Sequence, residues 1–126
     1  MMRIIVVDDH PVVRNGLCQL LGGQDDIEIL ASAADGDATL ALLKSGIQAN
    51  MVLTDLNMRG MDGWELTRQL TALNPALFVI ILTLHPQIAV KQRALAAGAK
   101  DCLSKDGDID ELLSALRAAH ASRAEI

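Results

Sequence analysis

The sequence predicts an α/β fold in which helices cover both faces of a parallel five-stranded sheet. Five short apolar segments alternate along the chain with five segments of helical periodicity. Such alternation is typical of parallel strands joined by helical crossovers. The length of 126 residues is near the commonest size of one domain, and 51% apolar residues are enough for a substantial core.

The first half of the chain contains three expected strands, at residues 4–7, 27–31 and 51–55. The first strand is β-branched and ends at the acidic pair Asp8-Asp9. Pro11 suits the first position of the helix that follows, with His10 as its cap. One face of this helix carries the apolar residues Val13, Leu17, Leu20 and Leu21. A second helix is expected from about residue 35 to residue 45.

The second half continues with expected strands at residues 77–82 and 102–104. The first of these is wholly apolar, as in a central strand that is buried on both faces. The helix before it follows a loop at residues 57–63 and buries Leu66, Leu70 and Leu73. The helix after it starts at Pro86 and carries on one side Val90, Ala94 and Ala97. The last helix opens at Asp108, and its apolar stripe comprises Ile109, Leu112, Leu113 and Leu116.

The composition argues against several classes of function. Aromatic residues make up only 2% of the chain, and 11 basic against 16 acidic residues give a net charge of −5. An acidic domain with few stacking surfaces is a poor candidate for binding nucleic acid by itself. Cys18 and Cys102 have no metal-ligand or redox spacing, which indicates reduced thiols in a cytoplasmic protein. The first apolar segment is too short for a signal sequence or a membrane span, so a soluble intracellular chain is expected.

Polar residues gather at the ends of four expected strands: Asp8 and Asp9, then Asp55, Thr83 and Lys105. In a doubly wound (βα)5, flavodoxin-like three-layer sandwich of strand order 2-1-3-4-5, the first and third strands end at a shared crevice. Three carboxylates within roughly 5 Å would repel pairwise by about 3 kcal/mol at an effective dielectric constant of about 20. A hard divalent cation offsets this repulsion, so the sequence predicts a Mg²⁺ site.

Such a site can bind a phosphoryl group. Asp55 can act as nucleophile and form an acyl phosphate, while the cation and Lys105 neutralise charge on the equatorial oxygens. Thr83 can donate a hydrogen bond to the bound group. Each residue also has a simpler explanation, because acidic pairs complement helix N-termini, threonine is a good strand former and loop lysines are solvated. Their joint placement at four strand ends favours the phosphoryl site.

The same residues resemble the receiver domains of two-component response regulators, over essentially the whole chain. The matching positions are Asp8, Asp9, Asp55, Gly63, Thr83 and Lys105. The segments that look specifically like the NarL/FixJ (LuxR-type) branch are residues 8–17, 82–85 and 103–106. The resemblance implies a receiver domain at residues 1–121 and the start of a linker or tail at residues 122–126. The helix-turn-helix output domain that is usual in this branch is not expected in this chain.

The resemblance also implies a role for each position at the metal site. Asp55 would receive a phosphoryl group from the phosphohistidine of a sensor histidine kinase and would contact Mg²⁺. Asp9 would ligate the ion directly and Asp8 largely through water. Asn57 would contribute its backbone carbonyl.

The resemblance extends to the switch and the partners. Lys105 would pair with the phosphoryl group and Thr83 would swing toward it, which changes the surface of the fourth helix, the fourth and fifth strands and the fifth helix. The implied partners are the sensor kinase, a second copy on phosphorylation, and DNA only through an output domain outside this chain; no membrane is expected. The domain would not be an enzyme, beyond catalysing its own phosphorylation from small donors and its own dephosphorylation.

Several positions depart from the family pattern. Arg59 stands where the family usually has proline and adds a cation near the site. Cys102 holds the position of the aromatic partner of the switch threonine, and Leu84 is bulkier than the residue that commonly follows that threonine. His85, two positions past Thr83, could modulate an attacking water or lie exposed.

Two other functions remain open. A phosphatase of the haloacid dehalogenase kind also forms an aspartyl phosphate. Its nucleophile follows the first strand, and a second aspartate comes two residues later, where this chain has Asn57. The third possibility is a receiver that no longer needs phosphate and acts as a constitutive binding module. The complete acidic set argues against that module, whereas Arg59 and Cys102 leave it open.

Overall fold

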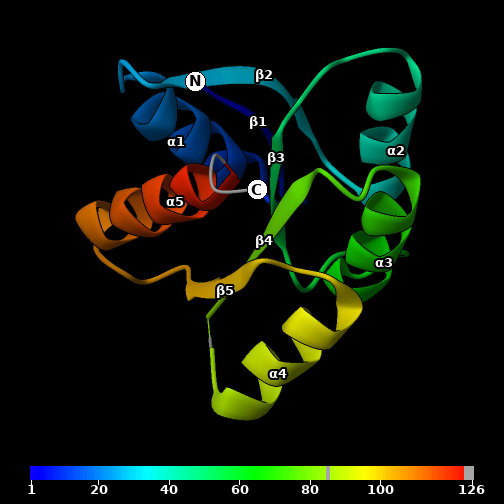
Figure 1. Ribbon diagram of the computed structural model, residues 1–126. Helices are drawn as coiled ribbons and strands as arrows, with labels where there is room; N and C mark the ends of the chain where they lie inside the picture. Colours follow the sequence, from blue (N-terminus) through cyan, green and yellow to red (C-terminus); the bar gives the residue numbers. More distant parts are fainter. Residues whose placement is uncertain (85, 124–126) are drawn as a thin grey trace.

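The structure, a computed structural model, describes residues 1–84 and 86–123, which form five strands alternating with five helices (Figure 1). The strands are β1 (Met2–Val7), β2 (Ile27–Ala33), β3 (Met51–Asp55), β4 (Phe78–Thr83) and β5 (Asp101–Ser104). The helices are α1 (Pro11–Gly22), α2 (Gly36–Lys44), α3 (Gly63–Leu73), α4 (Ile88–Ala97) and α5 (Ile109–Arg123). The predicted alternation is confirmed.

Two predictions concern parts of the chain that the structure does not describe. His85 and the last three residues of the expected tail, 124–126, lie outside the described residues. The sequence predicts a tail from residue 122 onward, whereas α5 continues to Arg123. Ala119 is the last residue of α5 in the described core, and the high helix propensity of alanine, present again at Ala121, favours one further turn.

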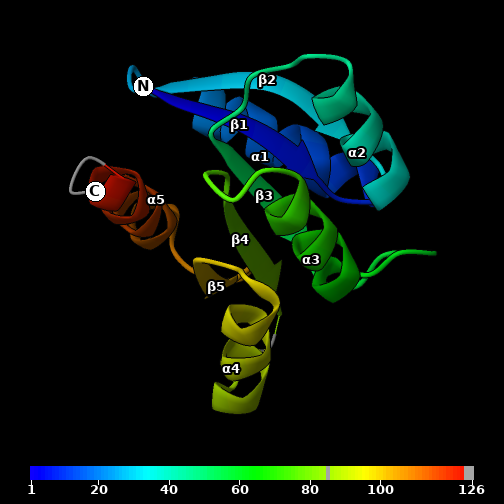
Figure 2. The ribbon, with the colours of Figure 1, turned by 45° about the vertical axis from the view of Figure 1, so that its right-hand side comes forward.

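All five strands are parallel, and their order is β2-β1-β3-β4-β5, as predicted. Helices α1 and α5 cover one face of the sheet, and α2, α3 and α4 cover the other (Figure 1). The turned view in Figure 2 shows α5 on the opposite side of the sheet from α2 and α3. The molecule is therefore a three-layer sandwich with a separate apolar core on each face of the sheet.

The predicted burial is confirmed for β4 and corrected for two helices. β4 is the predicted central strand, and Ile80 and Ile81, which point to opposite faces, are both 0% exposed. On α1, however, Val13 and Leu20 are 40% and 53% exposed, and on α3 Leu73 is 47% exposed. Both α1 residues line a groove between α1, α5 and the ends of β4 and β5, and Leu73 is the last residue of its helix.

The register of the sheet places the strand ends at one edge. Val7 of β1 pairs with Thr54 of β3, and Thr83 of β4 pairs with Ser104 of β5. The residues that follow these pairs therefore emerge side by side, at the carboxyl ends of the strands where α/β sheets bind ligands. This edge carries every polar residue that the sequence pattern selected.

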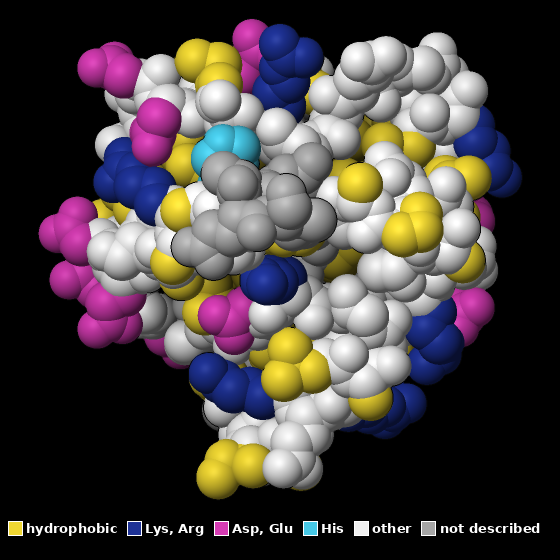
Figure 3. Space-filling view, viewed as in Figure 1, with side chains coloured by type: hydrophobic (Ala, Val, Ile, Leu, Met, Phe, Trp, Pro, Cys, Tyr) yellow, Lys and Arg dark blue, Asp and Glu magenta, His cyan; other side chains and the backbone are white. Residues whose placement is uncertain are grey.

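The surface agrees with the acidic composition. Figure 3 shows acidic and basic side chains interspersed over the visible face. Among the residues described here, none of the helices combines the length and the apolar character that a membrane span requires.

Candidate functional site

Three carboxylates meet at the ends of β1 and β3. Asp8 and Asp9 follow β1, and Asp55 is the last residue of β3. Asp8 is 1% exposed and Asp55 is 4% exposed, whereas Asp9 is half-buried. Each residue offers an oxygen that lies, together with a nitrogen of His10, in a group whose atoms are all within 4.8 Å of one another. The predicted convergence of the acidic side chains is confirmed.

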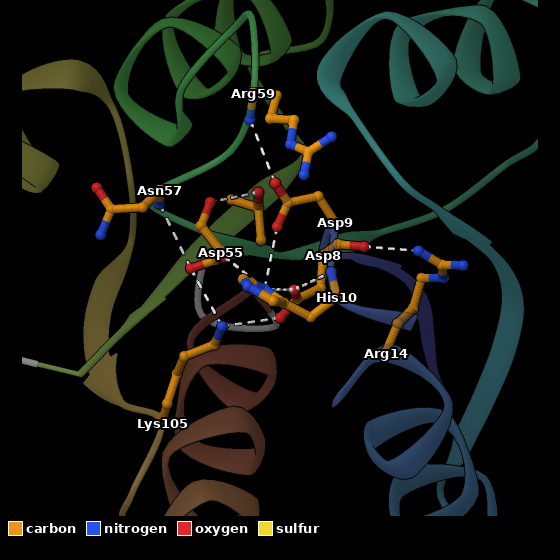
Figure 4. A network of polar contacts seen from close by, with 9 residues as sticks. Asp8, Asp9, His10, Arg14, Asp55, Asn57, Arg59 and Lys105 are labelled. Atoms are coloured by element: carbon orange, nitrogen blue, oxygen red, sulfur yellow. Dashed lines mark hydrogen bonds and ion pairs between the residues drawn. The ribbon is translucent and has the colours of Figure 1, made fainter. Parts of the chain in front are cut away.

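Lys105 reaches this cluster from the loop after β5. Its Nζ atom lies 2.9 Å from Asp8 Oδ2 and 3.2 Å from Asp55 Oδ1, so one ammonium group bridges two buried carboxylates (Figure 4). The lysine backbone is fixed as well, because its N–H donates to the carbonyl of Thr83 at 2.9 Å. Thr83, at the end of β4, is itself buried.

Burial and charge set the ionisation of the three bridged groups. Burial raises the pKa of Asp55, and the neighbouring Asp8 carboxylate raises it further against the opposing effect of Lys105. Burial also opposes ionisation of Asp8, but hydrogen bonds from Lys105 and His10 outweigh it and lower its pKa. Burial favours the neutral amine of Lys105, yet the two carboxylates together raise its pKa. Lys105 therefore favours the charged form of both carboxylates, and together with His10 this outweighs burial at Asp8 but not at Asp55.

His10 also enters the site, which the sequence did not predict. It is the N-cap residue of α1, as expected, but its side chain makes no capping hydrogen bond. Its ring turns toward the cluster, with Nδ1 3.0 Å from Asp8 Oδ1, 3.0 Å from Asp9 Oδ1 and 3.9 Å from Asp55 Oδ2. Its backbone N–H donates to Asp8 Oδ1 at 2.9 Å, which holds that carboxylate in place.

Arg14 is a second site residue that sequence reasoning missed. From the first turn of α1, its Nη1 group donates to the carbonyl oxygen of Asp8 at 2.7 Å (Figure 4). The bond fixes the backbone that presents the acidic pair. The sequence shows only that an arginine lies six residues after Asp8. An arginine at such a position in a helix is usually exposed to solvent, so the sequence does not reveal this contact.

The loop after β3 closes over the site. The N–H of Asn57 lies 3.4 Å from Asp55 Oδ1, and the N–H of Arg59 donates to Asp9 Oδ2 at 3.3 Å. The loop returns tightly to α3, because a Cβ atom at Gly63 would lie 2.8 Å from the Asp55 carbonyl oxygen. Glycine is therefore required where the backbone of α3 passes the end of β3.

Cys102 packs behind the site rather than within it. It is 1% exposed on β5 and lies in an apolar cluster with Trp64 of α3 and Ala94 of α4. Burial raises the pKa of its thiol. Nearby, the guanidinium carbon of Arg93 lies 4.7 Å from the centroid of the Trp64 ring, which connects α4 to α3.

The donor set fits a divalent cation. Oδ1 of Asp9 is buried and accepts no hydrogen bond, although it faces the cluster. Lys105 supplies one positive charge against three carboxylates, so the site retains negative charge. Such oxygen-rich groups are the ligands that Mg²⁺ prefers.

Comparison with known proteins agrees with this geometry. The response regulator receiver domain matches residues 4–117. The chain belongs to this family. It is 36% identical over 117 residues to the transcriptional regulatory protein UhpA of Escherichia coli (strain K12), covering 92% of this chain and 57% of that protein. The chain spans little more than half the length of the curated relatives it matches.

Solved structures give the same assignment. A LuxR-family response regulator from Aurantimonas sp. SI85-9A1 is similar, with a TM-score of 0.89 and 34% identity over 96% of this chain and 86% of that one. The receiver domain of the putative response regulator NarL from Mycobacterium tuberculosis has a TM-score of 0.85 and 31% identity, covering 94% and 96%. The flavodoxin-like fold and the resemblance to the NarL/LuxR branch are thereby confirmed. Receiver domains work with histidine kinases, bind Mg²⁺ at an acidic pocket and are generally not enzymes in the ordinary sense.

Proposed function

We propose that this receiver domain is switched by phosphorylation of Asp55, with a sensor histidine kinase as the donor and Mg²⁺ held by Asp8, Asp9, Asp55 and the carbonyl of Asn57. The observation that supports the proposal is the bridging ammonium of Lys105, 3.2 Å from Asp55 Oδ1. A phosphoryl group attached to that oxygen would place its charge beside a cation already fixed by Asp8.

The two carboxylate oxygens of Asp55 have different neighbours, which favours a different role for each: one attacks phosphorus and the other binds the metal. Oδ1 lies near Lys105 and the N–H of Asn57, so it is suited to attack phosphorus. Oδ2 lies 3.9 Å from Nδ1 of His10, which itself contacts Asp8 and Asp9, so it is suited to the metal. In the reaction Oδ1 bonds to phosphorus as the bond from phosphorus to the kinase histidine breaks, and the product is an acyl phosphate. The bound ion would neutralise charge on the phosphoryl oxygens.

Phosphorylation would be transmitted through Thr83. This residue is buried at the end of β4, between Asp55 on β3 and the surface formed by α4, β4, β5 and α5. In other receivers an aromatic side chain on the fifth strand moves inward when the threonine moves. Here Cys102 holds that position, and it is already buried. We propose that the threonine alone couples the site to that surface.

The wider assignments follow from the family. We propose a cytoplasmic receiver domain that extends to the end of α5 at Arg123, two residues beyond the expected boundary at residue 121, and that is connected to an output domain that controls transcription by binding DNA. A second copy of the chain is the proposed partner after phosphorylation. Arg59 lies where proline is usual, and its backbone contact with Asp9 supports a role in holding the loop over the metal site.

The proposal is tested with acetyl phosphate and Mg²⁺, followed by intact-mass spectrometry. We expect an addition of about 80 Da, the mass of one phosphoryl group. Asp55→Asn should remain unmodified. Asp62→Asn is the matched control, because Asp62 is an exposed carboxylate in the loop before α3 and should leave the addition intact. An unmodified wild-type protein would overturn the proposal.

Two measurements separate the alternatives. A phosphatase of the haloacid dehalogenase kind would turn over a phosphomonoester repeatedly, and Asn57 does not supply the second carboxylate that such enzymes use. We expect no such turnover. Beryllofluoride with Mg²⁺ should change the fluorescence of Trp64, the single tryptophan of the chain. An unchanged spectrum would instead indicate a constitutive binding module.

A further inference from the structure

The imidazole of His10 is 63% exposed, yet its Nδ1 atom lies within the acidic cluster. Its Nδ1 atom is 3.0 Å from Asp8 Oδ1 and 3.0 Å from Asp9 Oδ1 (Figure 4). An N-cap side chain normally accepts a hydrogen bond from its own helix, and this one does not. Pro11 follows it and fixes the start of α1. The ring therefore takes its position from the acidic site and not from the helix.

The separations match those of donors that share one metal ion. In an octahedral site with metal–ligand distances of about 2.1 Å, adjacent donors are about 3.0 Å apart and opposite donors about 4.2 Å apart. Nδ1 lies 3.0 Å from two of the carboxylate oxygens and 3.9 Å from Asp55 Oδ2. Nδ1 is thus spaced from the Asp8 and Asp9 oxygens as one ligand of an octahedral ion is from its neighbouring ligands.

One buried carboxylate oxygen of the cluster has no hydrogen-bond donor. Nδ1 carries at most one hydrogen, and only its contact with Asp8 Oδ1 has hydrogen-bond geometry. Asp9 Oδ1, at the same distance, is buried and accepts no hydrogen bond. With the ring proton on Nε2, the lone pair of Nδ1 points into the cluster, and a cation between the three atoms would satisfy all of them.

We propose that His10 is a metal ligand through Nδ1, so that the site binds divalent ions with affinity for nitrogen, such as Mn²⁺, Co²⁺ and Ni²⁺, more tightly relative to Mg²⁺ than an all-oxygen receiver site does. Imidazole suits these transition metals, and their affinities rise from Mn²⁺ to Ni²⁺. The inference rests on the proposed function only in placing a metal ion among Asp8, Asp9 and Asp55.

Spectroscopy of the Mn²⁺-loaded protein tests the ligand directly. Electron spin-echo modulation should show a coordinated histidine nitrogen, and the signal should change when the protein is labelled with ¹⁵N-histidine. His10→Asn should lose the signal. The chain contains three histidines, so His85→Asn and His120→Asn are the matched controls and should retain it. Asparagine is a favourable N-cap, so His10→Asn should keep α1 intact, which circular dichroism checks.

Affinities measured by calorimetry give a second readout. His10→Asn should weaken Co²⁺ and Ni²⁺ binding at least about tenfold. Removing a residue that only hydrogen-bonds to a metal ligand already lowers affinity by about this factor, so removing a ligand should lower it at least as much. Mg²⁺ binding should change less than about threefold, since that ion prefers oxygen and retains several waters. If the variant binds every ion more tightly by the same factor, the ring is an obstacle to the metal and the proposal is wrong.

The outcomes also separate this proposal from the proposed function. A wild-type protein that binds Mn²⁺ without nitrogen coupling, and is still phosphorylated with Mg²⁺, would overturn the role of His10 alone. A protein that binds neither ion would overturn the metal site itself, and with it both proposals.

Discussion

Replacing Lys105 with methionine removes the cation that bridges two buried carboxylates while keeping most of the side-chain volume. The ammonium lies 2.9 Å from Asp8 Oδ2 and 3.2 Å from Asp55 Oδ1. At an effective dielectric constant of about 20, each contact is an attraction of about 5 kcal/mol. Desolvation offsets much of this gain, and breaking a buried pair typically costs about 3–5 kcal/mol. Because Asp55 can take up a proton once its pKa rises further, we expect a loss of about 3 kcal/mol in unfolding free energy near neutral pH.

The pH dependence identifies the cause of the loss. In the wild-type protein the pKa of Asp8 is lowered, so its contribution is present above its unfolded pKa and is lost as the pH falls. The raised pKa of Asp55 acts in the opposite sense, so its favourable contribution is lost as the pH rises through the folded value. Without Lys105, burial raises the pKa of both carboxyls. The difference between variant and wild type should therefore grow from about pH 4 toward neutral pH.

Urea unfolding followed by the fluorescence of Trp64 measures both quantities. Lys91→Met, an exposed lysine on α4, is the matched control and should change stability by no more than about 0.5 kcal/mol. Added Mg²⁺ should stabilise Lys105→Met more than wild type, since the variant site is more negative. A loss that is equal at both ends of the pH range would mean that packing, and not charge, explains it. No loss at all would refute the bridging role.

Three further predictions concern the frame around the site. Gly63→Ala should lower the free energy of unfolding by about 1–3 kcal/mol, because the new Cβ would lie 2.8 Å from backbone atoms that cannot move aside. Gly22→Ala is the control, because its Cβ would lie 3.7 Å from the nearest atom, and the same urea titration should show no loss of stability or a small gain. Cys102, which is 1% exposed, should react with a thiol reagent only on unfolding, whereas half-buried Cys18 reacts first; equal rates in the native protein would contradict the burial. Leu116→Ala should lose about 2–5 kcal/mol of unfolding free energy, because this fully buried residue anchors α5 to the sheet, and a smaller loss would show that α5 is loosely packed.

Periodicity and strand ends were enough to predict the fold and the convergence of Asp8, Asp55 and Lys105 at one edge of the sheet. The alternation of apolar segments with helical ones requires parallel strands, and parallel strands end at the same edge of a sheet. The sequence therefore predicted that three side chains would lie close together, and the structure places Lys105 in contact with both Asp8 and Asp55. The buried central strand β4 was predictable for the same reason, since only a strand covered on both faces is apolar throughout.

The tertiary structure decided what local patterns cannot specify. His10 had the position of a helix cap, but the direction of its ring depends on the acidic side chains that the fold places beside it. The backbone contact of Arg14 with Asp8 likewise exists only once α1 has packed. Val13 and Leu20 belong to an apolar helical face, yet the packing of α1 leaves them at a groove. Sequence periodicity gives the direction of a helix face, whereas side-chain exposure and ring orientation depend on neighbours that are distant in the chain.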